Sequence, residues 1–221
     1  MKQHTQTEAI VLKRWDYGEK DQIVNFFSKD HGRMQGIAKG ARGSRHRFLG
    51  CLDLFSYISL SYQDKKSGTL VLMDQAELLC GFPNIRKTYA ALMLATSLLE
   101  MAYRFYHEGE KDLRGFHVLK DSLYALENQK GQKEVFWSAL LHHLKIMGVL
   151  PSFQEDLQYG KQSFQLSDSL KARLQEIPSE KFENFSFTLE EENILHPLLR
   201  THLQYQLELD IDWAPFFQGV E

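Results

Sequence analysis

The chain has 221 residues, of which 43% are hydrophobic and 25% are charged, and its formal net charge is −3. This length and composition are typical of a folded protein with one large domain or two small ones, and they argue against extensive disorder. The two cysteines are too few for a disulfide scaffold or a four-cysteine zinc site.

The hydropathy pattern indicates neither secretion nor membrane insertion. Residues 1–15 contain no long apolar run and no small-residue cleavage site. The longest nearly apolar segment, residues 89–106, is interrupted by polar residues that include Glu100 and Arg104. Such a segment is typical of a buried helix rather than a membrane span. We therefore expect a cytoplasmic protein.

The charges are distributed unevenly along the chain. Residues 1–80 contain 12 Lys and Arg against 9 Asp and Glu, a balance of +3. Residues 81–221 contain 14 Lys and Arg against 20 Asp and Glu, a balance of −6. A basic first part and an acidic second part suggest two modules with different partners.

Short β-rich segments separated by turns at intervals of about ten residues predict five strands in the first part. The strands are expected at residues 9–12, 23–28, 33–39, 51–62 and 69–79, with turns at 16–21, 29–32 and 63–68. Gly32 suits a turn position with positive φ. This pattern predicts a small antiparallel barrel. Five strands is the number in an OB-fold, although an SH3-like barrel would leave a similar pattern.

After Pro83 the apolar period becomes helical. We expect helices from the N-cap Asn84 to residue 106, at 112–128, at 132–147 before Gly148, at 167–177 and from Thr188, where Thr188 and Glu191 form a capping-box pattern. Pro197 predicts a break or kink at His196, and residues 151–165 are expected to be a loop. The fold class is therefore α+β, with an OB-fold barrel at 1–80 and an all-helical domain at 84–221.

The segment from Arg33 to Arg47 is a local charge anomaly. It carries five cations and three glycines but no acidic residue. A glycine-containing basic loop can place backbone N–H groups and guanidinium groups along a phosphate chain. A flexible solvated turn is the alternative explanation. The segment therefore suggests nucleic-acid binding without requiring it.

Other cations and aromatic residues in the barrel extend this candidate surface. The candidate DNA-binding residues are Lys13, Arg14, Arg33, Lys39, Arg42, Arg45 and Arg47. Trp15 and Tyr17 are candidates for base stacking, whereas Phe48 is expected in the core. A basic groove with stacking rings is the usual design for single strands, because phosphates supply affinity and rings supply sequence-tolerant stacking.

Catalytic motifs are absent from the sequence. No G-x-S-x-G, H-E-x-x-H or paired C-x-x-C motif is present, and Gly40 is followed by Ala41-Arg42 rather than by the Lys-Ser/Thr of a phosphate loop. His142 and His143 are adjacent on a predicted helix and point about 100° apart, which suits joint metal binding poorly. His196 and His202 are similarly expected to be structural, as are Cys51 and Cys80. We therefore expect a non-enzymatic protein without a metal site.

Several motifs resemble those of the bacterial recombination mediator family RecO. In the first part they are EAIVLKR at 8–14, DYGE at 16–19 with Asp21, HG at 31–32, and IAKGAR at 37–42 with Ser44 and Arg45. In the helical part a looser similarity includes Leu140, Leu141, Leu144, Gly148, Leu199, Arg200, Leu203 and Leu207. The resemblance spans most of the chain.

The resemblance implies an OB-fold followed by a helical domain, and a role in DNA repair through RecF-type homologous recombination. It also implies binding to single- and double-stranded DNA, annealing of complementary strands, and cooperation with RecR and the single-strand-binding protein SSB to load RecA. Many family members carry a four-cysteine zinc module after the segment that matches residues 140–150. Here residues 151–165 contain no cysteine, so a zinc site is not implied.

One alternative belongs to a different functional class. In this alternative, the protein is a scaffold for protein interactions. Its barrel binds an acidic tail of another protein, and any affinity of the barrel for DNA is incidental. A small-molecule enzyme is disfavoured, because the sequence shows no set of acid, base and nucleophile. Binding to a mixed-sequence oligonucleotide and to an acidic C-terminal peptide separates the first two possibilities.

Overall fold

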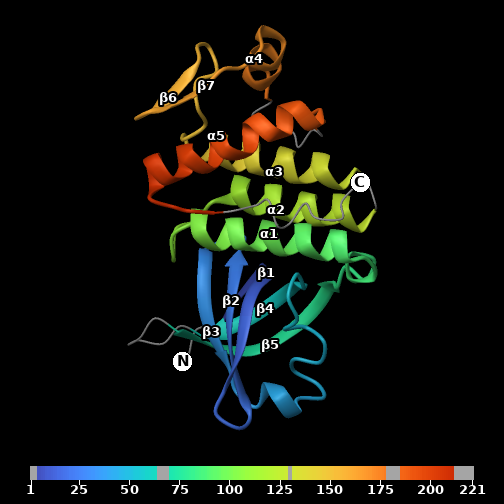
Figure 1. Ribbon diagram of the computed structural model, residues 1–221. Helices are drawn as coiled ribbons and strands as arrows, with labels where there is room; N and C mark the ends of the chain where they lie inside the picture. Colours follow the sequence, from blue (N-terminus) through green and yellow to red (C-terminus); the bar gives the residue numbers. More distant parts are fainter. Residues whose placement is uncertain (1–3, 64–69, 129–130, 178–184, 212–221) are drawn as a thin grey trace.

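Five strands form a closed barrel in the first part of the computed structural model (Figure 1). The structure describes residues 4–63, 70–128, 131–177 and 185–211. The strands are β1 (His4–Tyr17), β2 (Asp21–Ser28), β3 (Gly32–Ala38), β4 (Tyr57–Gln63) and β5 (Leu70–Cys80). Their order around the barrel is β1-β2-β3-β5-β4, with β3 parallel to β5 and the other neighbours antiparallel. This topology is that of an OB-fold, and the predicted fold class is confirmed.

Two predicted strand boundaries differ from the structure. β1 is 14 residues long because its first half pairs with β4 and its second half with β2. The strand predicted at residues 51–62 begins only at Tyr57. Phe48, Cys51, Leu52 and Phe55 are buried in the connection before it. The first three join the core inside the barrel and Phe55 joins the core beneath the helices, instead of alternating along a strand. The turn predicted at 63–68 falls mainly outside the described residues.

The second part is built mainly from helices. They are the short 3-10 turn η2 (Ile85–Lys87) and the helices α1 (Tyr89–Phe105), α2 (Leu113–Glu127), α3 (Gln132–Ile146), α4 (Asp168–Gln175) and α5 (Leu189–Leu207). Figure 1 shows α1 lying across one end of the barrel, with α2, α3 and α5 in successive layers beyond it. Among the residues that the structure describes, no helix is long and apolar enough to cross a membrane.

Side-chain caps begin most of these helices where the sequence predicts them. Asp112 caps α2, Ser167 caps α4, and Thr188 forms the predicted capping box with Glu191 at α5. The prediction for α1 is wrong, because its cap is Thr88, whose Oγ1 accepts a hydrogen bond from the N–H of Ala91 at 3.3 Å. Asn84 precedes η2 instead, and its backbone N–H donates to the carboxylate of Glu127.

Two further predictions about the helical part need correction. Of the break or kink predicted at His196, the break does not occur, because α5 continues through Pro197 from Leu189 to Leu207. A proline removes one helical hydrogen bond, while buried leucines on both sides, Leu195 and Leu198, keep the helix packed against its neighbours. The loop predicted at 151–165 contains a small antiparallel hairpin of β6 (Leu157–Tyr159) and β7 (Gln162–Phe164).

The barrel has one core inside it and shares a second core with the helices. Ala9 and Val11 of β1 point into the barrel, whereas Ile10 and Leu12 belong to the core under the helices. Phe27 of β2 joins this second core and stacks on Tyr106 with a ring-centroid distance of 4.8 Å. The barrel and the helices are therefore connected by continuous apolar packing.

Gly32 makes the close approach between these two parts possible. Its φ is +69°, as its predicted turn position requires, and a Cβ atom there would lie 1.8 Å from the backbone oxygen of Glu110. Nearby, the N–H of Gly109 donates a hydrogen bond to the carbonyl oxygen of Arg33 at 2.8 Å. The connection between α1 and α2 is thus held against the start of β3.

Candidate nucleic-acid interface

The outward-pointing residues of β1, β2 and β3 form one surface, which we call the outer face. Val24 and Phe26 point into the barrel core, so Ile23 and Asn25 point to the opposite side of the strand, where both are nevertheless buried. Cross-strand pairing then aligns outward residues in rows: Trp15 with Ile23 and Ile37, and Lys13 with Asn25 and Gln35. This strand-2–strand-3 surface is the part of an OB-fold that commonly binds oligonucleotides.

The outer face has two halves. In the helix-covered half, Ile10, Leu12 and Phe27 are buried beneath the helices. In the open half, at the opposite end of the same strands, Trp15 is 42% exposed and Tyr17 is 55% exposed. Both rings lie on the same side of β1 because they are two residues apart. The open half therefore presents two aromatic rings that are available for stacking.

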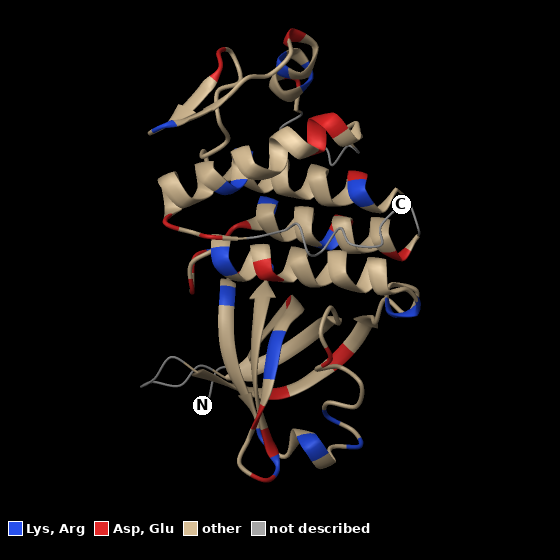
Figure 2. Cartoon of the chain, in the orientation of Figure 1, with Lys and Arg blue, Asp and Glu red and all other residues tan. Residues whose placement is uncertain are grey.

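A basic loop, residues 39–47, borders the open half. It contains the short 3-10 turn η1 (Ala41–Gly43) and lies beside the β1–β2 turn, at the end of the barrel away from α1 (Figure 1). Figure 2 shows Lys and Arg segments along this loop and on the neighbouring strands. The loop end of the barrel thus carries most of the predicted cations.

Specific contacts hold the backbone of the basic loop. Gly40 adopts a φ of +68°, and its N–H donates to Oδ1 of Asp21 at 2.8 Å. Ser44 Oγ accepts hydrogen bonds from the N–H groups of Arg47 and Phe48, at 3.1 and 3.2 Å. Phe48 is buried in the barrel core, as predicted. The alternative of a merely flexible turn is therefore not supported by this arrangement.

The cations of the loop differ in how they are engaged. Lys39, Arg42 and Arg45 are exposed. Arg42 donates from Nη1 to the carbonyl oxygen of Glu19 at 3.2 Å, and its Nε lies 3.5 Å from a carboxylate oxygen of Asp16. The basic segment has no acidic residue in sequence, but the fold brings the carboxylates of other segments next to it. Its local charge is therefore smaller than its sequence indicates.

Arg47 has a structural role within the loop. Its Nη2 donates to the carbonyl oxygen of Lys39 at 2.6 Å, and its guanidinium lies over the ring of Phe48 at 5.2 Å. Its own carbonyl oxygen accepts a hydrogen bond from the N–H of Ala76 at 2.8 Å. Arg47 therefore closes the loop against β5 while its side chain remains exposed.

Arg14 lies on the other side of β1 from the stacking rings. Its cross-strand partner is Val24, which points into the barrel, and its Nη1 forms an ion pair with Asp53 at 2.9 Å. The side chain remains 42% exposed at the mouth of the barrel. Arg14 therefore does not share the outer face with Trp15 and Tyr17.

Lys13 and Arg33 lie at the boundary between the two halves of the outer face, against α1. Lys13 Nζ forms an ion pair with Glu100 at 2.8 Å and lies 3.7 Å from the ring centroid of Tyr103. Arg33 donates from Nε to the carbonyl oxygen of Tyr106 at 2.9 Å, and its guanidinium lies 4.7 Å from the same Tyr103 ring. The structure thus separates these two predicted cations from the basic loop.

Sequence patterns did not indicate the residues of α1 that meet these cations. Tyr103 and Glu100 belong to a helix that is apolar on most faces, and their contacts with Lys13 arise only in the tertiary fold. A bulge in β1 between Val11 and Lys13 adds one residue to the strand. Because of it, Leu12 and Lys13 both reach α1, which strict alternation would prevent.

His143 and His202 are buried, and each contacts the hydroxyl group of a tyrosine. His143 is fully buried, and its Nδ1 lies 2.6 Å from the hydroxyl oxygen of Tyr106. Burial lowers the pKa of His143 to about 3, with a smaller contribution from neighbouring His142. His202 Nδ1 lies 2.6 Å from Oη of Tyr159. Within the described ranges, no group of three or more His, Cys, Asp or Glu residues could hold a metal ion.

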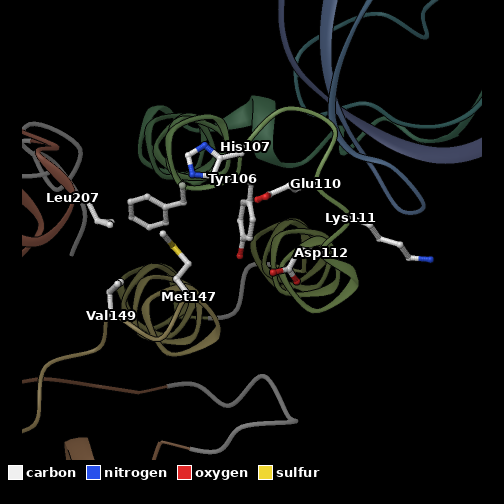
Figure 3. Close-up of a pocket in the computed structure, with 9 residues that line it drawn as sticks. Tyr106, His107, Glu110, Lys111, Asp112, Met147, Val149 and Leu207 are labelled. Atoms are coloured by element: carbon white, nitrogen blue, oxygen red, sulfur yellow. The ribbon is translucent and has the colours of Figure 1, made fainter. Parts of the chain in front are cut away.

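A separate pocket of about 560 Å³ lies in the helical part (Figure 3). Met147, Val149 and Leu207 line one side of it, and Glu110 and Asp112 lie on the other. The lining also includes His107 and Lys111, so it is part apolar and part charged, with residues of both signs. It does not extend the basic surface of the barrel.

Comparison with known proteins identifies the same family in both parts of the chain. The family model "Recombination protein O N terminal" matches residues 1–82, and "Recombination protein O C terminal" matches residues 86–212. The DNA repair protein RecO of Syntrophobacter fumaroxidans is 35% identical over 150 residues, which are 68% of this chain and 59% of that protein. The DNA repair protein RecO of Desulfatibacillum aliphaticivorans is 36% identical over 151 residues, or 67% and 58% of the two chains.

These matches agree with the motifs and with the fold. The aligned segment spans less than two thirds of the length of both relatives. The two family models cover the barrel and nearly all of the described helical part. The chain therefore belongs to the recombination protein O (RecO) family of DNA repair proteins.

Proposed function

We propose that this protein is a non-enzymatic recombination mediator that binds single- and double-stranded DNA through its barrel. It anneals complementary strands and, together with RecR, helps to load RecA onto single-stranded DNA coated with SSB. The observation that carries the proposal is the open half of the outer face. There, two exposed aromatic rings of β1 lie beside a hydrogen-bonded loop with four exposed cations. Membership in a DNA repair family supports the same conclusion.

The chemistry of this surface suits nucleic acid without sequence preference. Lys39, Arg42 and Arg45 supply charge to phosphates, and release of the counterions that screen those phosphates drives binding. Trp15 and Tyr17 supply faces on which any base can stack. Contacts to phosphates fix the position of a strand but do not read its sequence. We therefore expect similar affinities for oligonucleotides of different sequence.

Annealing follows from the same electrostatics. Two complementary strands repel each other through their phosphates, and a cationic surface that neutralises both strands lowers this repulsion. In our proposal residues 1–80 hold the DNA, whereas the helical part, residues 84–221, docks the protein partners RecR and SSB. The acidic balance of residues 81–221 is consistent with this division of roles, because it disfavours a large DNA interface there.

Strand annealing tests the proposal. Complementary labelled oligonucleotides are mixed with the wild-type protein, with the triple variant Lys39→Ala, Arg42→Ala, Arg45→Ala, or with a control in which exposed Lys87, Arg114 and Lys161 become alanine. Each reaction is run with and without SSB. We expect the wild type and the control to accelerate annealing and the loop variant to lose the acceleration. Equal annealing by all three proteins contradicts the proposed DNA surface.

A comparison of binding affinities tests the scaffold alternative. Single-stranded DNA and an acidic C-terminal peptide are titrated against the wild type and against the loop variant. The proposal predicts that DNA binds the wild type with the higher affinity and that binding weakens for all sequences in the variant. Selective binding of the peptide, with negligible affinity for DNA, supports the scaffold instead.

A further inference from the structure

A cluster of charged side chains lies where the barrel meets α1. We call it the junction cluster: Lys13 and Arg33 from the barrel, and Glu100, Tyr103 and Arg104 from α1. Lys13 and Arg33 both lie over the ring of Tyr103, at 3.7 and 4.7 Å from its centroid. Glu100 contacts two of the cations, Lys13 at 2.8 Å and Arg104 at 2.5 Å. A second carboxylate acts on the cluster from outside: the pKa of Asp210 is lowered mainly by a hydrogen bond from Arg200 and also by the charge of Arg104.

The three cations of this cluster outnumber the two carboxylates, Glu100 and Asp210, that act on them. Burial acts to raise the pKa of Glu100, but hydrogen bonds from Lys13 and Arg104 outweigh it and hold the pKa below its ordinary value. Glu100 is therefore ionised at neutral pH and balances one of the three positive charges. Lys13 and Arg104 remain partly open to solvent, with 38% and 40% of their side-chain surfaces exposed. A phosphate group can therefore reach both side chains without a change in the backbone structure.

The position of the cluster connects it to the open half of the outer face. Lys13 is two residues before Trp15 on β1, and Arg33 begins the outward row of β3 that ends beside Lys39. Six residue steps separate Arg33 from Lys39, which corresponds to roughly 20 Å along a strand. That distance equals about six base steps of a DNA strand in a duplex. One strand can therefore extend from the basic loop to α1 along the outer face.

From this geometry we infer that α1 contributes to the nucleic-acid interface. Arg104, Lys13 and Arg33 form a second phosphate-binding site, which contacts the DNA strand at the end away from the basic loop. The ring of Tyr103 packs against Lys13 and Arg33 and holds them in place. Glu100 weakens the site, because it occupies Lys13 and Arg104 when DNA is absent. This inference rests on the proposed DNA binding. It extends that proposal, which assigned DNA binding to residues 1–80 alone, by adding residues of the helical part to the DNA interface.

Opposite charge changes at two neighbouring positions of α1 test the inference. Binding of a 30-nucleotide mixed-sequence single strand is measured by fluorescence anisotropy across a range of salt concentrations. In Arg104→Ala, the slope of log affinity against log salt should decrease in magnitude by about 0.7, the value for one phosphate contact on a single strand. In Glu100→Gln, affinity should rise severalfold, because Lys13 and Arg104 lose their competing carboxylate. Lys161→Ala, in the distant β6–β7 turn, is the matched control and should leave both quantities unchanged.

A purely structural role for the cluster gives a different result. In that case Glu100→Gln lowers the melting temperature without raising the affinity, and Arg104→Ala leaves the salt slope unchanged. The inference is overturned if Glu100→Gln does not raise the affinity, or if Arg104→Ala does not change the salt slope. Thermal unfolding of each variant verifies that it is folded, and loss of an exposed i,i+4 ion pair is a small change for a helix of 17 residues.

The loop variant distinguishes failure of this inference from failure of the proposed function. If Lys39→Ala, Arg42→Ala, Arg45→Ala weakens binding but the α1 variants do not change it, the second site is absent and the proposed function stands. If none of the variants changes binding, both are contradicted. If both sites bind one strand, their effects on log affinity should add in the combined variant, because sites roughly 20 Å apart are beyond direct coupling.

Discussion

The two halves of the outer face use the same three strands but have opposite surroundings. In the helix-covered half, Phe27 is fully buried and stacks on Tyr106. In the open half, Trp15 and Tyr17 occupy equivalent outward positions and remain substantially exposed. The outward direction of a side chain therefore does not determine its role. The helical part covers one half, and there Tyr106, together with Phe116 of α2, makes an outward aromatic ring part of the core.

The cations follow the same division. Lys13 and Arg33, at the boundary with α1, are engaged by Glu100, Tyr103 and the backbone of Tyr106. Lys39 and Arg45, in the basic loop, are exposed. A cation near a helix is held in place by local partners, whereas a cation on an exposed loop is free to reorient toward a phosphate. The comparison predicts that mutations in the helix-covered half affect stability and those in the open half affect binding.

The largest expected effect is on stability in the helix-covered half. Phe27→Ala removes a ring that packs against Tyr106 at 4.8 Å and Phe116 at 5.9 Å. The free energy of unfolding should decrease by about 3–5 kcal/mol, as is typical when a buried phenylalanine is truncated. Urea denaturation measures this change. The control Tyr17→Ala, in the open half, should change it by less than about 0.5 kcal/mol, and equal losses would refute the division into two halves.

The next effect is on binding in the open half. Trp15→Ala removes an exposed ring that is available for base stacking, which typically contributes about 1–3 kcal/mol per base. The dissociation constant for single-stranded DNA should increase accordingly, while Trp15→Phe should retain much of the affinity because an aromatic face remains. Fluorescence anisotropy measures both variants. Unchanged affinity in Trp15→Ala would show that this ring does not stack on DNA.

A third prediction concerns stability at acidic pH. It sharpens the contrast between the helix-covered half and the open half, because it depends on packing in the helical part alone. The pKa of His143 is about 3 in the folded protein, against 6.5 for an ordinary histidine. Between these values the unfolded chain binds more protons than the folded one, so stability is complete above pH 6.5 and decreases as the pH falls. Each pH unit costs about 1.4 kcal/mol from this group.

Urea denaturation at pH 7 and pH 5 tests this prediction in the wild type and in His143→Gln. From pH 7 to pH 5 the wild type should lose about 2 kcal/mol more stability than the variant, because the variant lacks the titrating group. His202 is present in both proteins, and its lowered pKa therefore cancels in the difference. Parallel pH profiles for the two proteins would argue that His143 is accessible to protons in the folded state.

The smallest expected effect is at the edge of the basic loop. Asp16 lies 3.5 Å from Nε of Arg42, and both side chains are about half exposed. Asp16→Asn should release Arg42 and tighten DNA binding by less than about 1 kcal/mol, since an exposed ion pair contributes no more than that. An anisotropy titration at low salt measures the change. Weaker binding would mean that Asp16 positions Arg42 productively instead of competing for it.

Local signals in the sequence predicted much of the fold. The capping box of Thr188 and Glu191, the positive φ of Gly32 and the five β-rich segments depend on neighbouring residues, and all are present in the structure. The start of β4 was predicted too early, because Phe48, Cys51 and Leu52 fill the barrel core and Phe55 joins the core beneath the helices, all without forming a strand. Continuation of α5 through Pro197 depends on packing that no local rule represents.

The candidate site was less accessible to sequence reasoning. The charge and glycine content of the basic loop are local, so its composition indicated a phosphate-binding role. The carboxylate of Asp16 beside Arg42, and the position of Lys13 against α1, result from tertiary contacts and a strand bulge. A sequence pattern identifies which cations are present, but only the fold determines which of them remain free.

The salt dependence of DNA binding tests the central claim most directly. Log affinity for a mixed-sequence single strand is plotted against log salt for the wild type and for the Lys39→Ala, Arg42→Ala, Arg45→Ala variant. If the basic loop contacts phosphates, the wild type shows a steep linear decrease, and the slope of the variant is smaller by about 2, which corresponds to about 100-fold weaker binding at 0.1 M salt. Identical slopes, or binding by the wild type that does not depend on salt, would contradict the claim that this end of the barrel holds DNA.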